Sequence, residues 1–272
     1  MTVPADDEDL ATAVLWEKGT SGIEVRPAGQ GEVRLLAYFP DAAGLEPALA
    51  AALAPLRRAR LRAAEVPDVD WVARFREGFR SFTAAGFVVT PPWEIPSFPR
   101  PAAARDVLVV DPGRAFGTGT HETTRLCLGL LRELAARGPL GRVLDLGTGS
   151  GILGVAAARL GAETVTAVDL DPEAIVSARH HARLNGVELR LVRADLARAL
   201  RPAAFDLLTA NLSAPLLRER RDELLALDAP ILVLSGLLAG DEPAVRDAYG
   251  GAGEVEVRRD GEWVALLVSR RP

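Results

Sequence analysis

The chain has 272 residues, of which 49% are hydrophobic and 25% are charged, and its formal net charge is −5. This composition is typical of a globular protein with a sizeable core, and the negative charge argues against the basic surface of a general nucleic-acid-binding protein. The single cysteine, Cys127, excludes an internal disulfide and a multi-cysteine metal site. The acidic amino terminus and the lack of a long apolar run favour neither a signal peptide nor a membrane span. We therefore expect a cytoplasmic enzyme without a metal centre.

Residues 1–66 predict a small α+β domain. The pattern indicates a helix, two strands joined by a turn, a second helix that Pro55 could shorten, and a last strand, at residues 9–18, 22–26, 32–39, 45–58 and 59–66. This order is that of a ferredoxin-like sandwich without a clear first strand. If the first strand exists, it must lie in the few residues before Pro4.

Residues 67–82 predict a helix that links this domain to the rest of the chain. Asp70 could cap it, and Trp71, Phe75 and Phe79 are spaced to share one face. A core-facing helix would show the same pattern. The position between a complete small sandwich and a complete α/β unit favours a linker, which leaves residues 83–272 as the second domain.

The residue pattern of the second domain predicts a doubly wound, mostly parallel sheet. Short strands are expected at residues 87–90 and 107–110, before a helix at 120–136. From residue 142 onward, strands at 143–146, 165–170, 189–192, 205–210 and 231–234 alternate with helices at 152–160, 172–185, 214–227 and 243–249 and with a short turn at 196–200. Apolar strands that alternate with helices form a parallel sheet covered on both faces. Residues 255–258 and 263–268 predict a closing hairpin, so the final strand should be antiparallel to its neighbour.

A glycine-rich turn lies between the strand at 143–146 and the helix that follows. Residues 145–151 read Asp-Leu-Gly-Thr-Gly-Ser-Gly. Gly147, Gly149 and Gly151 permit a tight turn and allow a ligand to lie against bare backbone. The motif is therefore typical of a nucleotide-binding α/β unit, but by itself it does not distinguish a dinucleotide from S-adenosylmethionine.

The next strand ends with acidic residues at the spacing that such a site requires. Asp169 lies where a carboxylate accepts hydrogen bonds from ribose hydroxyls, although a plain strand-end carboxylate would look the same. Asp171, which precedes a proline, better fits the cap of the following helix. An NAD-dependent dehydrogenase would also carry Asp169, so both cofactors stay open at this point.

Two further features flank the glycine turn in sequence. Asn211 follows an apolar strand and could offer its amide oxygen to a substrate amine, or it could cap the helix that starts near Ala214. Residues 111–125 form a hydroxyl-rich loop that leads into a helix, with threonine hydroxyls and helix N–H groups as donors for a ligand. His121 in this loop is either a proton acceptor or an ordinary polar loop residue.

The loop carries a family resemblance. Residues 116–124, Phe-Gly-Thr-Gly-Thr-His-Glu-Thr-Thr, resemble the signature of bacterial ribosomal protein methyltransferases of the PrmA type, which modify the large-subunit ribosomal protein L-eleven (L11). The segments 71–93, 145–151, 168–172 and 210–212 follow the family order. The similarity covers roughly residues 70–268, whereas the amino-terminal part matches in element order more than in residues.

The resemblance implies a class I, Rossmann-like methyltransferase with a seven-stranded sheet and S-adenosylmethionine as its cofactor. It implies N-methylation of lysine side chains and of the N-terminal α-amine of L11. From charge and hydropathy we expect no membrane and no sequence-specific nucleic acid as partners, and we expect a monomer. The small domain would recognise L11, and the linker would let the catalytic domain reach several amines. The cofactor contacts of the family correspond to Thr124, Gly147, Asp169 and Asn211. We also expect Phe116, Thr118, Gly149 and Gly151, from the same two loops, at the cofactor site.

Such a transfer needs positioning more than side-chain chemistry. The amine must arrive neutral, yet a free lysine has a pKa near ~10.4 and an α-amine near ~8. Burial beside a positive sulfonium lowers the pKa of the amine. Our hypothesis is that the Asn211 side-chain oxygen orients the amine, and that His121 is a weaker candidate for a proton acceptor.

Three alternatives remain from the sequence. The fold could act on another protein or on a small molecule, because fold does not determine substrate; the extra amino-terminal domain favours a macromolecule. A dehydrogenase would leave the 111–125 loop and Asn211 without a role in hydride transfer. A ribosome-assembly factor could bind the cofactor without turnover.

Overall fold

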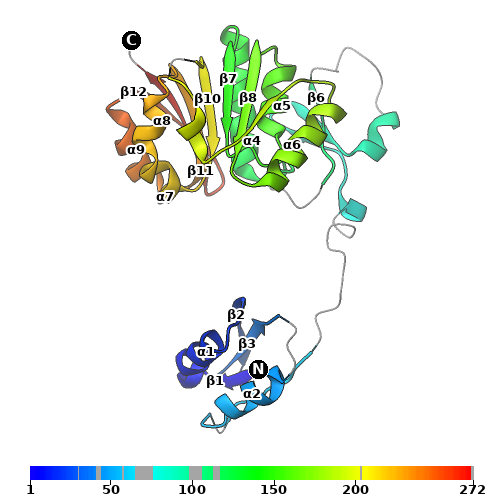
Figure 1. Ribbon diagram of the computed structural model, residues 1–272, viewed down its shortest axis with the longest axis vertical. Helices are drawn as coiled ribbons and strands as arrows, with labels where there is room; N and C mark the ends of the chain where they lie inside the picture. Colours follow the sequence, from blue (N-terminus) through cyan, green and yellow to red (C-terminus); the bar gives the residue numbers. More distant parts are fainter. Residues whose placement is uncertain are drawn as a thin grey trace. The chain divides into compact units, whose positions relative to one another are not determined.

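The computed structural model describes residues 1–29, 31–40, 44–56, 58–64, 76–97, 106–112, 117–202 and 204–270. The chain divides into two compact units, Met1–Val69 and Asp70–Pro272 (Figure 1). Most of the linker helix expected at 67–82, including Trp71 and Phe75, lies outside the described residues. Phe79 is described and is buried in the core of the second unit.

The amino-terminal unit has a three-stranded antiparallel sheet with the order β1-β3-β2. Its elements are β1 (Thr2–Pro4), a short 3-10 turn (Ala5–Asp7), α1 (Glu8–Glu17), β2 (Gly22–Gly29), β3 (Glu32–Tyr38) and α2 (Leu45–Ala52). The first strand of the sandwich is therefore present, at the start of the chain. The helix α2 ends before Pro55, as proline disfavours a longer helix.

The strand expected at 59–66 is reduced, among the described residues, to one bridge at Arg60. Thr2 N donates to Arg60 O at 3.0 Å, and Arg60 N donates to Thr2 O at 2.9 Å. The neighbouring Met1 O accepts from Leu35 N of β3 at 2.9 Å. Because successive residues of a strand point their polar groups to opposite sides, the Arg60 segment borders β1 on the side away from β3. This gives the strand order of a ferredoxin-like sandwich.

The second unit contains a seven-stranded sheet with the order β12-β13-β11-β10-β7-β8-β9. The strands are β7 (Arg142–Leu146), β8 (Thr164–Asp169), β9 (Arg190–Arg193), β10 (Leu207–Asn211), β11 (Ile231–Leu238), β12 (Gly253–Asp260) and β13 (Trp263–Arg270). The final strand β13 is antiparallel to both β11 and β12, and the other described pairs are parallel. The predicted mostly parallel sheet with an antiparallel final strand is confirmed.

Helices pack on both faces of this sheet. One set, α4 (Glu122–Arg137), α5 (Ile152–Arg159) and α6 (Pro172–Leu184), packs side by side and contacts the strands from β12 to β9. A second apolar core joins the other face to α7 (Ala214–Glu219), α8 (Arg221–Ala226), α9 (Glu242–Gly250) and a 3-10 turn (Leu196–Ala199). The arrangement is that of a doubly wound α/β fold. None of the helices in the described part of the chain is long and apolar enough to cross a membrane.

The prediction of a single helix at 214–227 is wrong, because the structure has two helices there, α7 and α8. The break lies at Arg220, whose backbone leaves the helical region with φ −95° and ψ 11°. Its guanidinium contacts Asp195 at 3.3 Å and Glu223 at 3.1 Å, which holds the bend against the 3-10 turn. Arginine has a high helix propensity, so the local pattern does not reveal the break.

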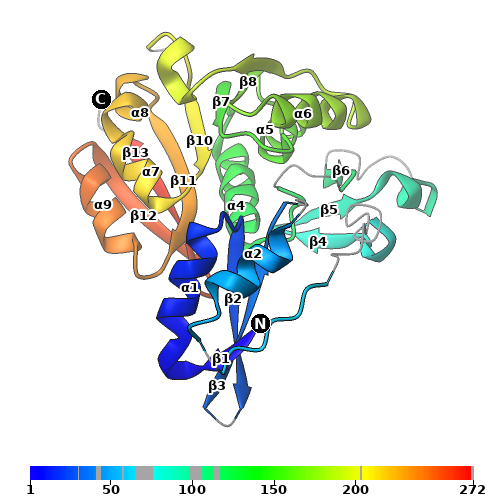
Figure 2. The same cartoon turned by 60° about the horizontal axis from the view of Figure 1, so that its bottom comes forward.

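A small sheet precedes the main one in sequence (Figure 2). Its strands are β4 (Phe82–Ala84), which the sequence analysis did not predict, β5 (Phe87–Thr90) and β6 (Val107–Val109), followed after β5 by a 3-10 turn (Pro92–Ser97). Asn185 at the end of α6 accepts from Val109 N and donates to Val109 O, both at 2.8 Å. The Asn185 side chain thus makes the two hydrogen bonds that a neighbouring strand would make with Val109. Through this contact α6 anchors the end of β6.

A second contact from α6 holds the next residues of the chain. His181 Nε2 accepts a hydrogen bond from Asp111 N at 3.0 Å. Burial lowers the pKa of His181, which favours the neutral ring that this contact requires. Asn185 and His181 together fix the point from which the 111–121 loop begins.

We predict that Asn185→Ala destabilises the protein. The substitution leaves the buried N–H and C=O of Val109 without their partner, and each unsatisfied group costs about 1–3 kcal/mol. We expect the free energy of unfolding to fall by about 2–4 kcal/mol in urea titrations followed by circular dichroism. Glu188→Ala, an exposed substitution nearby, is the control. Equal stability of both variants would contradict the role of Asn185.

Candidate active site

Three of the predicted site features lie at the carboxyl edge of the parallel strands. The glycine turn follows β7, Asp169 ends β8 and Asn211 ends β10. From β7 the chain proceeds to β8 and β9 on one side and returns through β10 on the other. Ligands of open α/β sheets bind at this point of reversal.

The glycine turn packs so closely that side chains are excluded. Gly147 and Gly151 have φ values of 66° and 84°, a region that favours glycine. A Cβ atom would lie 2.4 Å from Leu212 Cδ2 at Gly147, and 2.9 Å from Ala178 Cβ at Gly151. The turn therefore leaves bare backbone at the edge of the sheet. Gly149, with a φ of 55°, lies between them.

A buried carboxylate, that of Asp145, holds the glycine turn by hydrogen bonds. Asp145 is 1% exposed and accepts hydrogen bonds from Thr148 Oγ1 at 2.6 Å and from Thr209 Oγ1 at 2.8 Å. Burial raises the pKa of Asp145, and the two hydroxyl donors oppose that shift. Asp145 joins β7, the turn and β10, a role that the sequence motif did not distinguish.

Asp169 faces the same turn. Its Oδ2 accepts from Gly149 N at 2.9 Å and its Oδ1 from Asp171 N at 3.0 Å. Each carboxylate oxygen can accept a second hydrogen bond, so capacity remains for ligand hydroxyls. Asp171 instead caps α6, where its Oδ1 accepts from Glu173 N at 2.8 Å, as predicted.

The loop before α4 is tied to the glycine turn. Ser150 Oγ donates to Gly117 O at 2.5 Å. The hydroxyls of Thr118 and Thr120 lie 3.0 Å apart, so Thr118 makes a local contact within the loop. Phe116 lies outside the described residues.

Thr124 provides a polar group without a partner among the described residues. The residue is 1% exposed, and its Oγ1 finds no hydrogen-bond partner among the described residues. A buried hydroxyl in that state costs about 1–3 kcal/mol. A bound ligand at the site could supply the missing partner.

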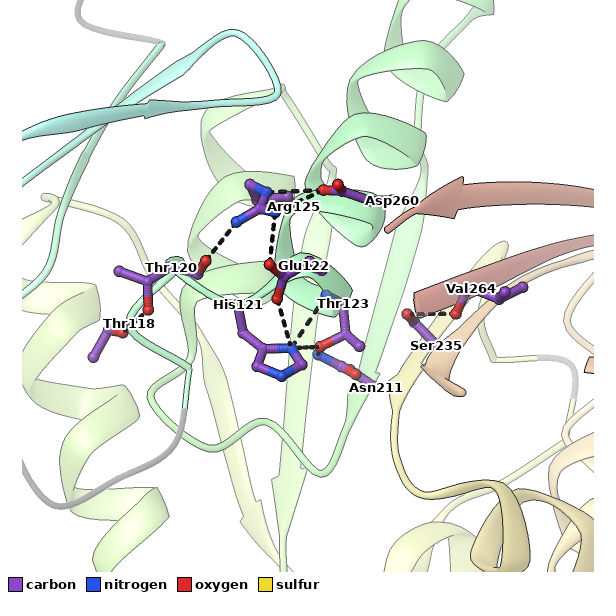
Figure 3. Close-up of polar contacts among 10 residues, drawn as sticks. All are labelled: Thr118, Thr120, His121, Glu122, Thr123, Arg125, Asn211, Ser235, Asp260 and Val264. Atoms are coloured by element: carbon purple, nitrogen blue, oxygen red, sulfur yellow. Dashed lines mark hydrogen bonds and ion pairs between the residues drawn. The ribbon is translucent and has the colours of Figure 1, made fainter. Parts of the chain in front are cut away.

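Asn211 contacts the start of α4 and does not cap α7. Its Nδ2 donates to Thr123 Oγ1 at 3.2 Å, and Thr123 Oγ1 lies 2.9 Å from His121 Nδ1 (Figure 3). The residue that precedes α7 is Ser213, which makes no side-chain capping bond. His121 is the cap of α4, because its Nδ1 accepts from Thr123 N at 3.3 Å.

The hairpin of β12 and β13 closes this side of the site. Arg125 donates to Asp260 at 2.9 Å and to Thr120 O at 2.6 Å, and it pairs with Glu122 at 3.1 Å (Figure 3). These contacts hold the hairpin against the start of α4. They bring the ring of Trp263 edge-on to His121, with centroids 4.5 Å apart.

Sequence reasoning missed Thr123, Arg125 and Trp263 as neighbours of the site. The Asp-Gly turn at 260–261 indicates that Trp263 begins a strand, but no local signal places that strand beside His121. The contact depends on the position of β13 in the sheet.

The residues present fit S-adenosylmethionine. The glycine turn offers bare backbone, Asp169 offers acceptors for ribose hydroxyls, and the Thr124 hydroxyl has no partner in the described part of the chain. Within the described ranges, no group of three or more His, Cys, Asp or Glu side chains could hold a metal ion.

We predict that Asp169→Ala weakens cofactor binding. The variant loses the ribose acceptors and the contact that braces the turn, and hydrogen bonds to a charged group contribute about 1.5–3 kcal/mol each. Calorimetric titration with S-adenosylhomocysteine should show affinity lower by at least about 10-fold. Asp171→Asn, which keeps a capping side chain, is the matched control. An unchanged affinity of Asp169→Ala would exclude Asp169 from the site.

Comparisons with known proteins identify the family of the chain. Residues 4–271 match the family model described as Ribosomal protein L11 methyltransferase (PrmA). Proteins of that name are 45% identical in Geobacter sulfurreducens, over 74% of this chain and 67% of the relative, and 36% identical in Deinococcus radiodurans, over 98% and 96%. The crystal structure of a ribosomal protein L11 methylase from Lactobacillus delbrueckii subsp. bulgaricus is 31% identical, with a TM-score of 0.63 over 71% of this chain and all of that one. The chain belongs to the ribosomal protein L11 methyltransferase (PrmA) family.

Proposed function

We propose that the protein transfers methyl groups from S-adenosylmethionine to lysine side chains and to the N-terminal α-amine of ribosomal protein L11. The observation that carries the proposal is the grouping at one sheet edge of the glycine turn, Asp169, the unpartnered Thr124 hydroxyl and the Asn211 amide. The first three suit a nucleoside cofactor, and the fourth suits an amine. Family membership supports the choice of both cofactor and substrate.

The bound cofactor supplies a methyl group on a positively charged sulfur, which is already activated for displacement. The protein must therefore position the amine and exclude its protonated form. We propose that Asn211 Oδ1 accepts one N–H of the neutral amine, which directs the lone pair toward the methyl group. Trp263 lies beside His121 at the same rim and would form one wall of the amine pocket.

We assign His121 a structural role within this site. Its Nδ1 accepts the capping hydrogen bond from Thr123 N and contacts the Thr123 hydroxyl. This arrangement supports a helix cap more than the proton acceptor that the sequence suggested as a weaker possibility. Loss of the amine proton would then occur before the amine enters the pocket.

The amino-terminal unit is proposed to recognise the substrate. Met1–Val69 has its own apolar core and is a unit separate from the cofactor-binding fold. A separate folded unit is not required for cofactor binding, and it suits a macromolecular substrate. We propose domains at 1–66 and 83–272 with a linker at 67–82, and action in the cytoplasm, where L11 would be met. The monomeric state stays a prediction.

The proposed function is tested by incubating the full chain with purified L11 and labelled S-adenosylmethionine. We expect label in L11, mass increments of whole methyl groups, and peptides modified at lysines and at the N-terminus. L11 whose amines have been acetylated beforehand is the matched control and should accept no label. Cofactor binding without any transfer would favour an assembly factor, and transfer only to other acceptors would overturn the proposed substrate.

We predict that Asn211→Ala lowers kcat for L11 methylation. A misplaced amine costs about 100-fold in rate, whereas the affinity for S-adenosylhomocysteine should fall only a few-fold. Steady-state kinetics and calorimetric titration separate the two effects. Ser213→Ala, an exposed substitution at the same rim, should turn over like the wild type. An unchanged kcat in Asn211→Ala would remove Asn211 from the mechanism.

A further inference from the structure

His121, Thr123 and Asn211 form a chain of hydrogen bonds that joins the start of α4 to the end of β10. His121 Nδ1 lies 2.9 Å from Thr123 Oγ1, and Thr123 Oγ1 lies 3.2 Å from Asn211 Nδ2 (Figure 3). Thr123 is 2% exposed, so its hydroxyl has little access to water. The chain links residues that are 88 positions apart in sequence.

The direction of this chain follows from the helix cap. Thr123 N donates to His121 Nδ1 at 3.3 Å, so Nδ1 carries a lone pair and no proton. Because Nδ1 carries no proton, its 2.9 Å contact with Thr123 Oγ1 forms with the hydroxyl as donor, so the backbone N–H and the hydroxyl of Thr123 share the one Nδ1 lone pair. The Thr123 oxygen presents only lone pairs to Asn211, and the Asn211 end that faces it must be the NH₂ group.

The direction matters because an amide has two different ends. Rotation of the Asn211 amide by half a turn would exchange Oδ1 and Nδ2, which are nearly equal in size. With Nδ2 bound to Thr123, Oδ1 is the end left to accept an N–H from an amine. With the amide reversed, the two N–H groups of Asn211 Nδ2 would face the N–H groups of the substrate amine. No acceptor would then orient the amine, and its lone pair would not be directed toward the methyl group.

We infer that Thr123 is a positioning residue, which His121 holds in one hydroxyl orientation and which sets the end of the Asn211 amide that faces the substrate. The inference rests on the proposed methyl transfer to an amine. A helix cap alone does not explain the contact, because the cap uses the backbone N–H of Thr123 and would form with valine at this position. The buried hydroxyl is the part that reaches β10.

Thr123→Val tests this inference, because valine keeps the shape and the capping N–H but removes the hydroxyl. We expect kcat for L11 methylation to fall by about 10- to 100-fold, since a displaced reacting group costs about that much. The dissociation constant for S-adenosylhomocysteine should stay within about 3-fold, because a single neutral hydrogen bond contributes little. Thr123→Ser, which restores the hydroxyl, should recover kcat to within about 3-fold of the wild type.

Thr166→Val is the matched control, because Thr166 is also a buried threonine of the second unit but lies within β8. It should turn over like the wild type. Wild-type kcat in Thr123→Val, or a serine variant as slow as the valine variant, would overturn the inference.

The double variant Thr123→Val with Asn211→Ala shows whether Thr123 acts through Asn211. If it does, the double variant should be no slower than Asn211→Ala alone, because residues that act as a unit are not additive. An additional loss of about 10-fold or more would show that Thr123 acts independently and would overturn the inference.

A measurement without substrate separates this inference from the proposed function. Hydrogen exchange of the Asn211 side-chain NH₂, followed by NMR on isotope-labelled full-length protein, should be at least about 10-fold faster in Thr123→Val than in the wild type. Equal exchange would overturn the inference even for an active enzyme. If the wild type transfers no methyl to L11 but the exchange rates differ, the substrate proposal fails and the orientation of Asn211 stands.

Discussion

The position of the candidate site depends on the close packing of Leu212, the first residue after β10, against two glycines. Leu212 lies between two glycines: a Cβ on Gly147 would approach its side chain to 2.4 Å, and a Cβ on Gly236 would lie 2.2 Å from its carbonyl oxygen. Leu212 N also donates to Ser235 O at 2.9 Å. The Leu212 side chain thus packs on Gly147 and its backbone packs on Gly236, which holds the neighbouring Asn211 beside the glycine turn. The irregular pairing of β11 between Ser235 and Leu237 makes room for this packing.

The same edge is organised for positioning more than for proton transfer. Two carboxylates hold the glycine turn: Asp145 accepts from the Thr148 hydroxyl, and Asp169 accepts from Gly149 N. The start of α4 is held by His121 as a cap and by Arg125 through Asp260. Methyl transfer from an activated sulfonium needs an amine with a directed lone pair, and a rigid amide on a strand end can supply that direction. The methyl transfer therefore requires an accurately positioned amine, and the rigid groups at this edge of the sheet suit that requirement.

Local sequence features predicted much of the fold because their causes are local. The alternation of apolar strands with helices, the glycine turn, the proline after Asp171 and the closing hairpin all depend on a few adjacent residues. The same reasoning missed the interruption at Arg220, where a helix-favouring sequence bends and Arg220 pairs with Asp195 from another segment. Amide contacts that imitate a strand, such as that of Asn185 with Val109, have no sequence signature either.

The candidate site shows the same division. Gly147 and Asp169 could be identified from spacing, whereas the contact of Asn211 with Thr123 joins distant parts of the chain and required the sheet order. A structure of the protein with S-adenosylhomocysteine and L11 tests the central claim most directly. We expect the target amine nitrogen at about 3 Å from Asn211 Oδ1, with Nδ2 still bound to Thr123. An amine bound away from Asn211, or facing its Nδ2, would contradict it.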